Sequence, residues 1–373
     1  MAKPPKKHRT EFRKNRGART RRDDWTKKFQ QAEPDDTPKD ERISGKGDLT
    51  RKRTVRGVAA GQQAGGGVLL EVDESACLKG RVLSIHGLVS SVEAEDGAIY
   101  QCATRRLLKT LATDQRHVVA AGDRVLFRPA QGQEGIIERI EPRHGILSRA
   151  TRGRQHVLVA NVDQLIIVAS AAEPYLKPNL IDRFLVSAEQ GGLQACIVIN
   201  KVDLVDAASL APLVGVYSQM GYQVLLVSAR TGQGVSRLRR AMAARQSVIT
   251  GQSGVGKSSL LNAIQPGLGL AVAEVSADSQ KGRHTTTTAR LLPLEGGGYV
   301  VDTPGIRQFQ LWDVIPQEIA GCFRDLRPLV SRCDFPDCTH THEAGCAVKD
   351  AVADGWLDAR RYESYRHLYE GDA

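Results

Sequence analysis

The octapeptide Gly251–Ser258 (GQSGVGKS) is the sequence feature that most constrains the fold. It has the G-x-x-x-x-G-K-[ST] spacing, follows the apolar run Val248–Thr250 and opens the apolar helical stretch Ser259–Ile264. In that context the glycines let backbone N–H groups surround phosphates, and the helix N-terminus adds partial positive charge. We expect nucleotide contacts from consecutive residues, namely Gly251, Gln252, Ser253, Gly254, Val255, Gly256, Lys257, Ser258 and Ser259. Lys257 should reach the β- and γ-phosphates, and the Ser258 hydroxyl should complete a Mg²⁺ shell.

Two further turns are predicted to read the base. Asn200-Lys201-Val202-Asp203 closes the predicted strand Ala195–Ile199, and Ser228-Ala229-Arg230 closes Val224–Val227. An Asp carboxylate accepts hydrogen bonds from guanine N1–H and N2–H₂, a pair of donors that adenine lacks. We therefore expect Asp203 to select GTP over ATP. Asn200 should brace the loop, Lys201 should lie over the base, and a backbone N–H of the second turn should reach guanine O6.

Two segments are predicted to meet the γ-phosphate. Asp302-Thr-Pro-Gly305 follows the apolar run Tyr299–Val301, so Asp302 can hold Mg²⁺ through water and the Gly305 N–H can sense the phosphate. The hydroxyl-rich loop Gly282–Thr288 precedes it. One of Thr285 and Thr286 is expected to ligate the metal, and the sequence does not distinguish them.

The order of these motifs is unusual. In ordinary small GTPases the phosphate loop comes first and the base-reading turns come last, whereas here the base-reading turns precede Gly251–Ser258. The parts are therefore those of a circularly permuted GTPase, which can fold because domain termini often lie close together. Permutation makes the Asp302–Gly305 motif lead directly into residues 313–373. Our hypothesis is that nucleotide state moves this segment.

Patterning predicts a multidomain chain. Buried β-branched runs alternate with helical stretches from about Val157 to Gln310, which favours a doubly wound parallel sheet. About five short strands in residues 79–148 suggest a small OB-like β-barrel. The expected parts are a disordered basic tail and linker (1–75), the barrel (76–148), a circularly permuted P-loop α/β GTPase domain (149–311) and a C-terminal helical segment (312–373).

A Cys/His cluster lies in the last part. Cys333-x₄-Cys338 is followed by one imidazole and then by Cys346. Three thiolates and one imidazole form a closed tetrahedral zinc set, with no position left for catalysis. The spacing is not the usual C-x₂-C, and by position either His340 or His342 can be the fourth ligand. Such a metal would replace a hydrophobic core in a short helical segment, so residues 312–373 are expected to form a separate C-terminal helical zinc-binding domain.

Charge and cysteine content limit the partners and the compartment. Residues 1–56 hold 19 Lys and Arg against 9 Asp and Glu, so the tail alone accounts for the net charge of +10. Such a tail can neutralise RNA phosphates through counterion release. No uncharged stretch is continuously apolar, and residues 1–16 hold no apolar segment, so we expect neither membrane insertion nor secretion. Seven cysteines without an export signal indicate a reducing cytoplasm, and we expect a monomer.

With these motifs in place, the chain over residues 79–373 resembles the RsgA family of small-ribosomal-subunit biogenesis GTPases. The motif order, the preceding barrel and the Cys/His cluster carry the resemblance. It implies GTP hydrolysis with magnesium, stimulation by the small ribosomal subunit and its rRNA late in maturation, and one structural zinc. The family's C-x₄-C-x-H-x₅-C pattern matches Cys333, Cys338, His340 and Cys346, which favours His340 over His342. A permuted GTPase of large-subunit assembly is disfavoured, because such proteins lack this barrel and this cluster.

The residue after the D-x-x-G motif leaves the water-positioning group open. Many GTPases carry a Gln there, but this chain has Ile306, which cannot orient water. His284, in the loop expected near the γ-phosphate, is the best local candidate because histidine is an effective polar catalyst near neutral pH. Lys257 and His284 are thus the expected catalytic residues. The alternative function is a GTP-gated rRNA-binding module in which hydrolysis is incidental.

Overall fold

The computed structural model describes residues 6–11, 52–59, 68–111, 118–151, 154–270, 289–302 and 316–371. The chain forms two compact units, one of residues 1–161 with 288–291 and one of residues 162–287 with 292–373. The finer limits given above, at 75, 148 and 311, stay predictions. Among the described residues, no helix is long and apolar enough to cross a membrane.

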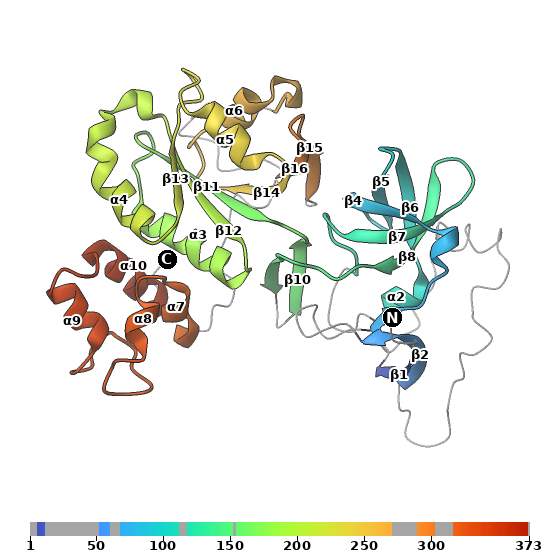
Figure 1. Cartoon of the computed structure of the whole chain (residues 1–373), viewed down its shortest axis with the longest axis horizontal. Coiled ribbons are helices and arrows are strands. Elements are labelled where there is room, and N and C mark those ends of the chain that lie inside the picture. Colours follow the sequence, from blue (N-terminus) through green and yellow to red (C-terminus); the bar gives the residue numbers. More distant parts are fainter. Residues whose placement is uncertain are drawn as a thin grey trace. The chain divides into compact units, whose positions relative to one another are not determined.

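Within residues 71–161, five strands close into a barrel, as the patterning predicted (Figure 1). Strand β4 pairs with both β5 and β7, β5 with β6, β6 in parallel with β8, and β8 with β7, which completes the circle. Inward residues alternate with outward ones, as they do along the whole of β5. The strands are β4 (Leu78–His86), β5 (Val89–Ala94), β6 (Ile99–Thr104), β7 (Arg124–Pro129) and β8 (Glu134–Ile140), with helix α2 (Arg106–Leu111) after β6 and the short turn η2 (Glu74–Ala76) before β4.

Phe127 fills the centre of this barrel and is fully buried. Two glycines make room for its ring. A Cβ on Gly80 would lie 2.9 Å from Phe127 Cε1, and one on Gly135 would lie 3.0 Å from Phe127 Cδ2. A barrel of five strands encloses little space. The Phe127 ring fills that space, and side chains at positions 80 and 135 would overlap with the ring.

The N-terminal region differs from the prediction of disorder through residue 75. Strands β1 (Lys6–Glu11), β2 (Lys52–Ala59) and β3 (Val68–Leu70) form a three-stranded antiparallel sheet. The low hydrophobicity of this region argues against a packed core. It does not argue against a β-sheet, because paired strands satisfy each other's backbone hydrogen-bonding groups. Residues 71–75 are also described and reach into η2, and the remainder of the predicted tail lies outside the described residues. A separate antiparallel pair, β9 (Leu147–Thr151) and β10 (Arg154–Val159), follows the barrel.

The second unit contains the predicted parallel sheet. Its strand order is β13-β12-β11-β14-β16, with parallel pairing throughout. Every residue of β11 is buried, as expected for a strand covered on both faces. The bounds are β11 (Gln164–Ser170), β12 (Gln194–Asn200), β13 (Gln223–Leu226), β14 (Arg245–Thr250) and β16 (Gly298–Asp302), with β15 (Arg290–Pro293) just before β16.

Helices cover both faces of this sheet. Ile166 and Val168 of β11 pack with the buried residues of α5 and α6, such as Leu238 and Leu260. The intervening Ile167 faces the other way, toward α3. The helices are α3 (Pro178–Gln190), α4 (Ala211–Gln219), α5 (Val235–Met242) and α6 (Lys257–Ile264), with short 3₁₀ turns η3 (Val202–Leu204), η4 (Ala207–Leu210) and η5 (Pro266–Leu268).

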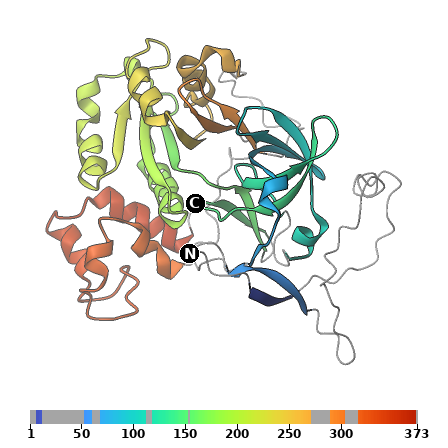
Figure 2. The same cartoon turned by 45° about the vertical axis from the view of Figure 1, so that its right-hand side comes forward.

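The C-terminal helices lie beside α3 in both views (Figures 1 and 2). They have a core of their own around Phe323 and Tyr365, which Val186 of α3 joins. The helices are α7 (Pro316–Cys322), α8 (Arg327–Val330), α9 (Ala347–Ala353) and α10 (Ala359–Glu370). Because this core shares residues with α3, the segment predicted as a separate domain belongs to the same compact unit as the parallel sheet.

A buried charge network fixes α10 to α3. Arg361 donates to Asp182 and forms two bonds with Asp325, from Nε to Oδ2 (2.9 Å) and from Nη2 to Oδ1 (3.0 Å). Only 3% of the Arg361 side chain and none of Asp182 is exposed. Tyr217 of α4 donates its hydroxyl to Asp182 at 2.8 Å. The network therefore ties three helices together in a place where charges are costly unless paired.

Breaking one partner should destabilise the second unit strongly. We expect Arg361→Met to lower the free energy of unfolding by about 3–5 kcal/mol, because it leaves Asp182 buried without its cation. Urea unfolding followed by circular dichroism measures the change. The matched control is Arg366→Met, which removes an exposed i,i+4 pair with Glu370 and should cost less than about 1 kcal/mol. Equal costs for the two variants would contradict the assignment.

Candidate nucleotide and metal sites

The phosphate loop leaves β14 in a conformation open only to glycine. Gly251 has φ +140°, and a Cβ there would lie 2.0 Å from the Val168 carbonyl oxygen. Gly256 has φ +92°, and its Cβ would lie 2.5 Å from Asn200 Nδ2. Gly256 is also the N-cap residue of α6. The loop can therefore curl against two neighbouring strand ends and aim its N–H groups toward one point.

The Lys257 ammonium is folded back over this loop. Its Nζ donates to the carbonyl oxygens of Gly251 (2.8 Å) and Gln252 (2.7 Å). Ser258 and Ser259 follow in the first turn of α6 and are half-buried. A cation held at the mouth of a loop of backbone N–H groups suits a polyphosphate.

Asn200 connects the phosphate loop to the second base-reading turn. The residue is 1% exposed, and its side chain donates from Nδ2 to Val255 O (2.8 Å) and accepts at Oδ1 from the Ala229 N–H (3.1 Å). A buried amide that uses both its ends fixes the distance between the groups it joins. Three segments that are far apart in the chain thus meet at one side chain.

Asp203 is held as an ionised acceptor. Ser228 Oγ donates to its Oδ1 (2.5 Å), and Arg230 Nε donates to its Oδ2 (2.8 Å). The hydrogen bond from Ser228, aided by the one from Arg230, lowers the pKa of Asp203 below its usual range. An ionised carboxylate offers only acceptors, which is what guanine N1–H and N2–H₂ require.

The structure describes some of the other predicted site residues and leaves four of them outside its described residues. Lys201, in the left-handed region at φ +61°, donates from Nζ to the Glu173 carbonyl oxygen. Val202 is buried and its N–H donates to Val227 O at 3.3 Å. Asp302 ends β16, where Val301 pairs with Val248, so its backbone reaches the same end of the sheet as the phosphate loop. His284, Thr285, Thr286 and Gly305 lie outside the described residues.

We expect Asn200→Ala to lower the affinity for GDP about tenfold or more, because a buried side-chain amide that joins the phosphate loop to the base-reading turn is lost. Isothermal titration calorimetry measures the affinity. Asn262→Ala is the matched control, since Asn262 also makes two bonds, to Leu270 O (2.8 Å) and from the Leu270 N–H (3.0 Å), at the far end of α6. An equal loss in both variants would point to general destabilisation instead.

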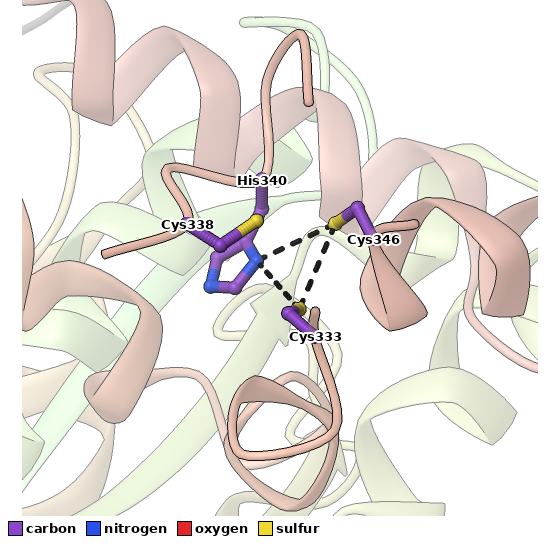
Figure 3. Close-up of side chains that lie close together, drawn as sticks. All are labelled: Cys333, Cys338, His340 and Cys346. Atoms are coloured by element: carbon purple, nitrogen blue, oxygen red, sulfur yellow. Dashed lines mark hydrogen bonds between the residues drawn. The ribbon is translucent and has the colours of Figure 1, made fainter. Parts of the chain in front are cut away.

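The four residues of the predicted zinc set come together. The ligand atoms of Cys333, Cys338, His340 and Cys346 lie within 4.8 Å of one another, and Figure 3 shows them turned toward a common centre. His340 Nδ1 is 3.4 Å from Cys333 Sγ and 3.5 Å from Cys346 Sγ, and the two sulfurs are 3.9 Å apart. Ligands about 2.0–2.3 Å from a tetrahedral zinc lie about 3.5–3.8 Å from each other. The three separations among Cys333, His340 and Cys346 match this spacing, and all four side chains have donor atoms that suit zinc.

Surrounding residues shape the ligand loop. Tyr362 and Tyr365 of α10 donate their hydroxyls to the carbonyl oxygens of His340 and Thr339, each at 2.7 Å. The Glu343 carboxylate accepts from the Thr339 N–H (2.6 Å) and the Thr341 N–H (3.0 Å). Burial opposes ionisation of Glu343, but these bonds and the Thr339 hydroxyl outweigh it and hold the pKa of Glu343 well below its usual range.

The structure thus favours His340 over His342, whose Nδ1 faces Thr341 Oγ1 at 3.0 Å. We expect His340→Ala to lose bound zinc, because three thiolates remain without the fourth ligand. His342→Ala should keep it. Metal content per chain, measured by mass spectrometry after extensive dialysis, checks both. Retention of zinc in the first variant with loss in the second would reverse the ligand assignment.

Two features near these sites have weak signals in the sequence. Arg361 and Asp182 are 179 positions apart in the chain. The one hint of a buried charge in the sequence is that Asp182 lies in an apolar stretch of α3. The pairing of Arg230 with Asp203 crosses two loops, and its residue types are ordinary for a surface. The Arg361–Asp182 pair belongs to no motif, and the two motifs that contain Asp203 and Arg230 do not predict that these residues pair.

A parallel sheet with a phosphate loop after β14, base-reading turns after β12 and β13, and the permuted order of these parts defines a circularly permuted GTPase. The comparisons with known proteins agree. The family profile described as RsgA GTPase matches residues 140–312. The Sodalis glossinidius protein called small ribosomal subunit biogenesis GTPase RsgA is 41% identical over 301 residues, which cover 79% of this chain and 86% of that one. The Gemmatimonas aurantiaca protein of the same name is 45% identical over 294 residues, covering 78% and 95%.

Two solved structures resemble the fold. The crystal structure of YjeQ from Thermotoga maritima has 37% sequence identity and a TM-score of 0.66, covering 79% of this chain and 98% of that one. YloQ, described as a circularly permuted GTPase, has 29% identity and a TM-score of 0.63, covering 81% and 96%. This chain belongs to the RsgA family and is a GTPase. The fold class predicted from the sequence is confirmed.

Proposed function

We propose that this protein hydrolyses GTP as a late assembly factor of the small ribosomal subunit, and that the subunit and its rRNA stimulate the reaction. Support comes from the name shared by the relatives at 40–45% identity, small ribosomal subunit biogenesis GTPase. The observation that supports GTP binding is the position of the Asn200 side chain, which joins the phosphate loop to the turn after β13. The proposed site of action is the cytoplasm.

The chain's own residues divide the work. Lys257 would exchange its loop carbonyl partners for the β- and γ-phosphates, and the ionised Asp203 would accept from the guanine edge. Gly251–Ser259 would cradle the phosphates, with Ala229 facing guanine O6. Magnesium bound with GTP supplies neutralisation of the phosphate charge, and the proposed residues for holding it are Ser258, Asp302 and one of Thr285 and Thr286. Gly305 would sense the γ-phosphate.

Hydrolysis needs a group that orients water. Ile306 cannot, so we propose that His284 takes this role when the protein is bound to the subunit. The zinc set Cys333, Cys338, His340 and Cys346 would be structural, because four protein ligands close a tetrahedral site. The basic N-terminal region would add affinity for rRNA phosphates.

Multiple-turnover release of phosphate, with and without purified small subunits, tests the proposal. We expect slow release alone and a large increase with subunits. His284→Ala should lower the stimulated kcat about 100-fold or more while GDP affinity stays unchanged, since general acid–base groups contribute about 10²–10⁴. The control is His367→Ala, a half-exposed histidine of α10.

Two outcomes would redirect the proposal. Binding to subunits without any increase in phosphate release would favour the GTP-gated binding module. Full stimulated kcat in His284→Ala would exclude this histidine and move the search to a group supplied by the subunit.

A further inference from the structure

The carboxylate assigned to the guanine base is already engaged within the chain. Ser228 Oγ donates to Asp203 Oδ1 at 2.5 Å. Arg230 approaches the other oxygen with two nitrogens, Nε at 2.8 Å and Nη2 at 2.5 Å from Oδ2. Only 10% of the Asp203 side chain is exposed, so its oxygens have little room for other donors. A guanine that binds here has to share or replace one of these partners.

The two partners differ in how firmly they are held. Ser228 is fully buried, and its Oγ also accepts from the Thr231 N–H at 3.1 Å. Its main chain is bonded on both sides, from its N–H to Gln233 O and from the Gly232 N–H to its own O, each at 2.9 Å. Arg230, by contrast, has a side chain that is 72% exposed. Moving Arg230 into solvent costs one exposed ion pair, whereas moving Ser228 would dismantle the turn.

The chemistry of the two competitors is the same. Guanine offers a carboxylate its N1–H, C2 and N2–H₂, a planar guanidine unit with two parallel donors. Arg230 offers Nε–H, Cζ and Nη2–H₂, which is also a planar guanidine unit with a fixed fork. Adenine has no such edge. The Arg230 side chain therefore presents to Asp203 the same donor array that distinguishes guanine from adenine.

We propose that Arg230 is a built-in competitor for guanine, which holds Asp203 until a guanine nucleotide displaces it. This inference rests on the proposed role of Asp203 as the guanine-reading residue. The apparent affinity for guanine nucleotides is then reduced by the fraction of molecules in which the pair is closed. An ion pair whose cation is largely exposed is weak, so the reduction should be about twofold to fivefold.

Stopped-flow binding of a ribose-labelled fluorescent GDP to the full chain tests this. We expect Arg230→Ala and Arg230→Met to raise the association rate constant about twofold to fivefold, while the dissociation rate constant changes little. The Met variant keeps most of the aliphatic stem and so separates loss of the guanidinium from loss of packing. Arg237→Ala, an exposed arginine of α5, removes the same charge elsewhere and should match the wild type.

Two further measurements give the inference its specificity. Binding of labelled ADP should not improve in Arg230→Ala, because adenine does not compete for Asp203. In an Asp203→Ala background, Arg230→Ala should have no added effect on GDP binding. Faster association that persists without Asp203, association no faster than in Arg237→Ala, or weaker GDP binding would each overturn the inference.

Failure of the inference can be told from failure of the proposed function. If Asp203→Ala keeps the full preference for GDP over ADP, the proposed base site is wrong. If that preference is lost while both Arg230 variants bind GDP like the wild type, only the role of Arg230 is wrong.

Discussion

The proposed nucleotide site depends on one buried side chain, the amide of Asn200. Asn200 is the last residue of β12. Its Nδ2 donates to the phosphate loop, and its Oδ1 accepts from the turn after β13. Gly256 has to be a glycine because this amide occupies the space of a Cβ. Where a buried amide has both ends satisfied, its partners have one arrangement. Phosphate-binding and base-reading groups are thereby held in a fixed relation.

Chain order matters less to this site than strand-end geometry. The carboxyl ends of β11, β12, β13 and β14 lie at one edge of the sheet because all four strands are parallel. Loops that follow those strands meet there whatever their sequence order. Permutation changes which segment follows β16. In this chain the C-terminal helices come next in sequence, and they share a compact unit with the sheet.

Two different kinds of polar interaction hold the C-terminal helices, a buried ion-pair network and a Cys/His cluster. Arg361 ties α10 to α3 through charges that are buried and paired, while Cys333, Cys338, His340 and Cys346 gather four ligands in a segment with a small core. Both need correct partners to be stable, since an unpaired buried charge or an unfilled thiolate set is costly. Both act together with the apolar core around Phe323 and Tyr365.

The sequence by itself determined the class of protein, because the glycines, Lys257, Asp203 and the Cys/His spacing have local chemical requirements that few other residues meet. It also determined the barrel and the parallel sheet, through about five short strands in one and continuous apolar runs alternating with helical stretches in the other. Tertiary structure alone decided the pairing of β1 with β2, the burial of Arg361 against Asp182, and the contact of Arg230 with Asp203. Each of these joins residues from separate elements, and a pair of ordinary charged residues or two short polar strands leaves no periodic signal from which a partner could be deduced.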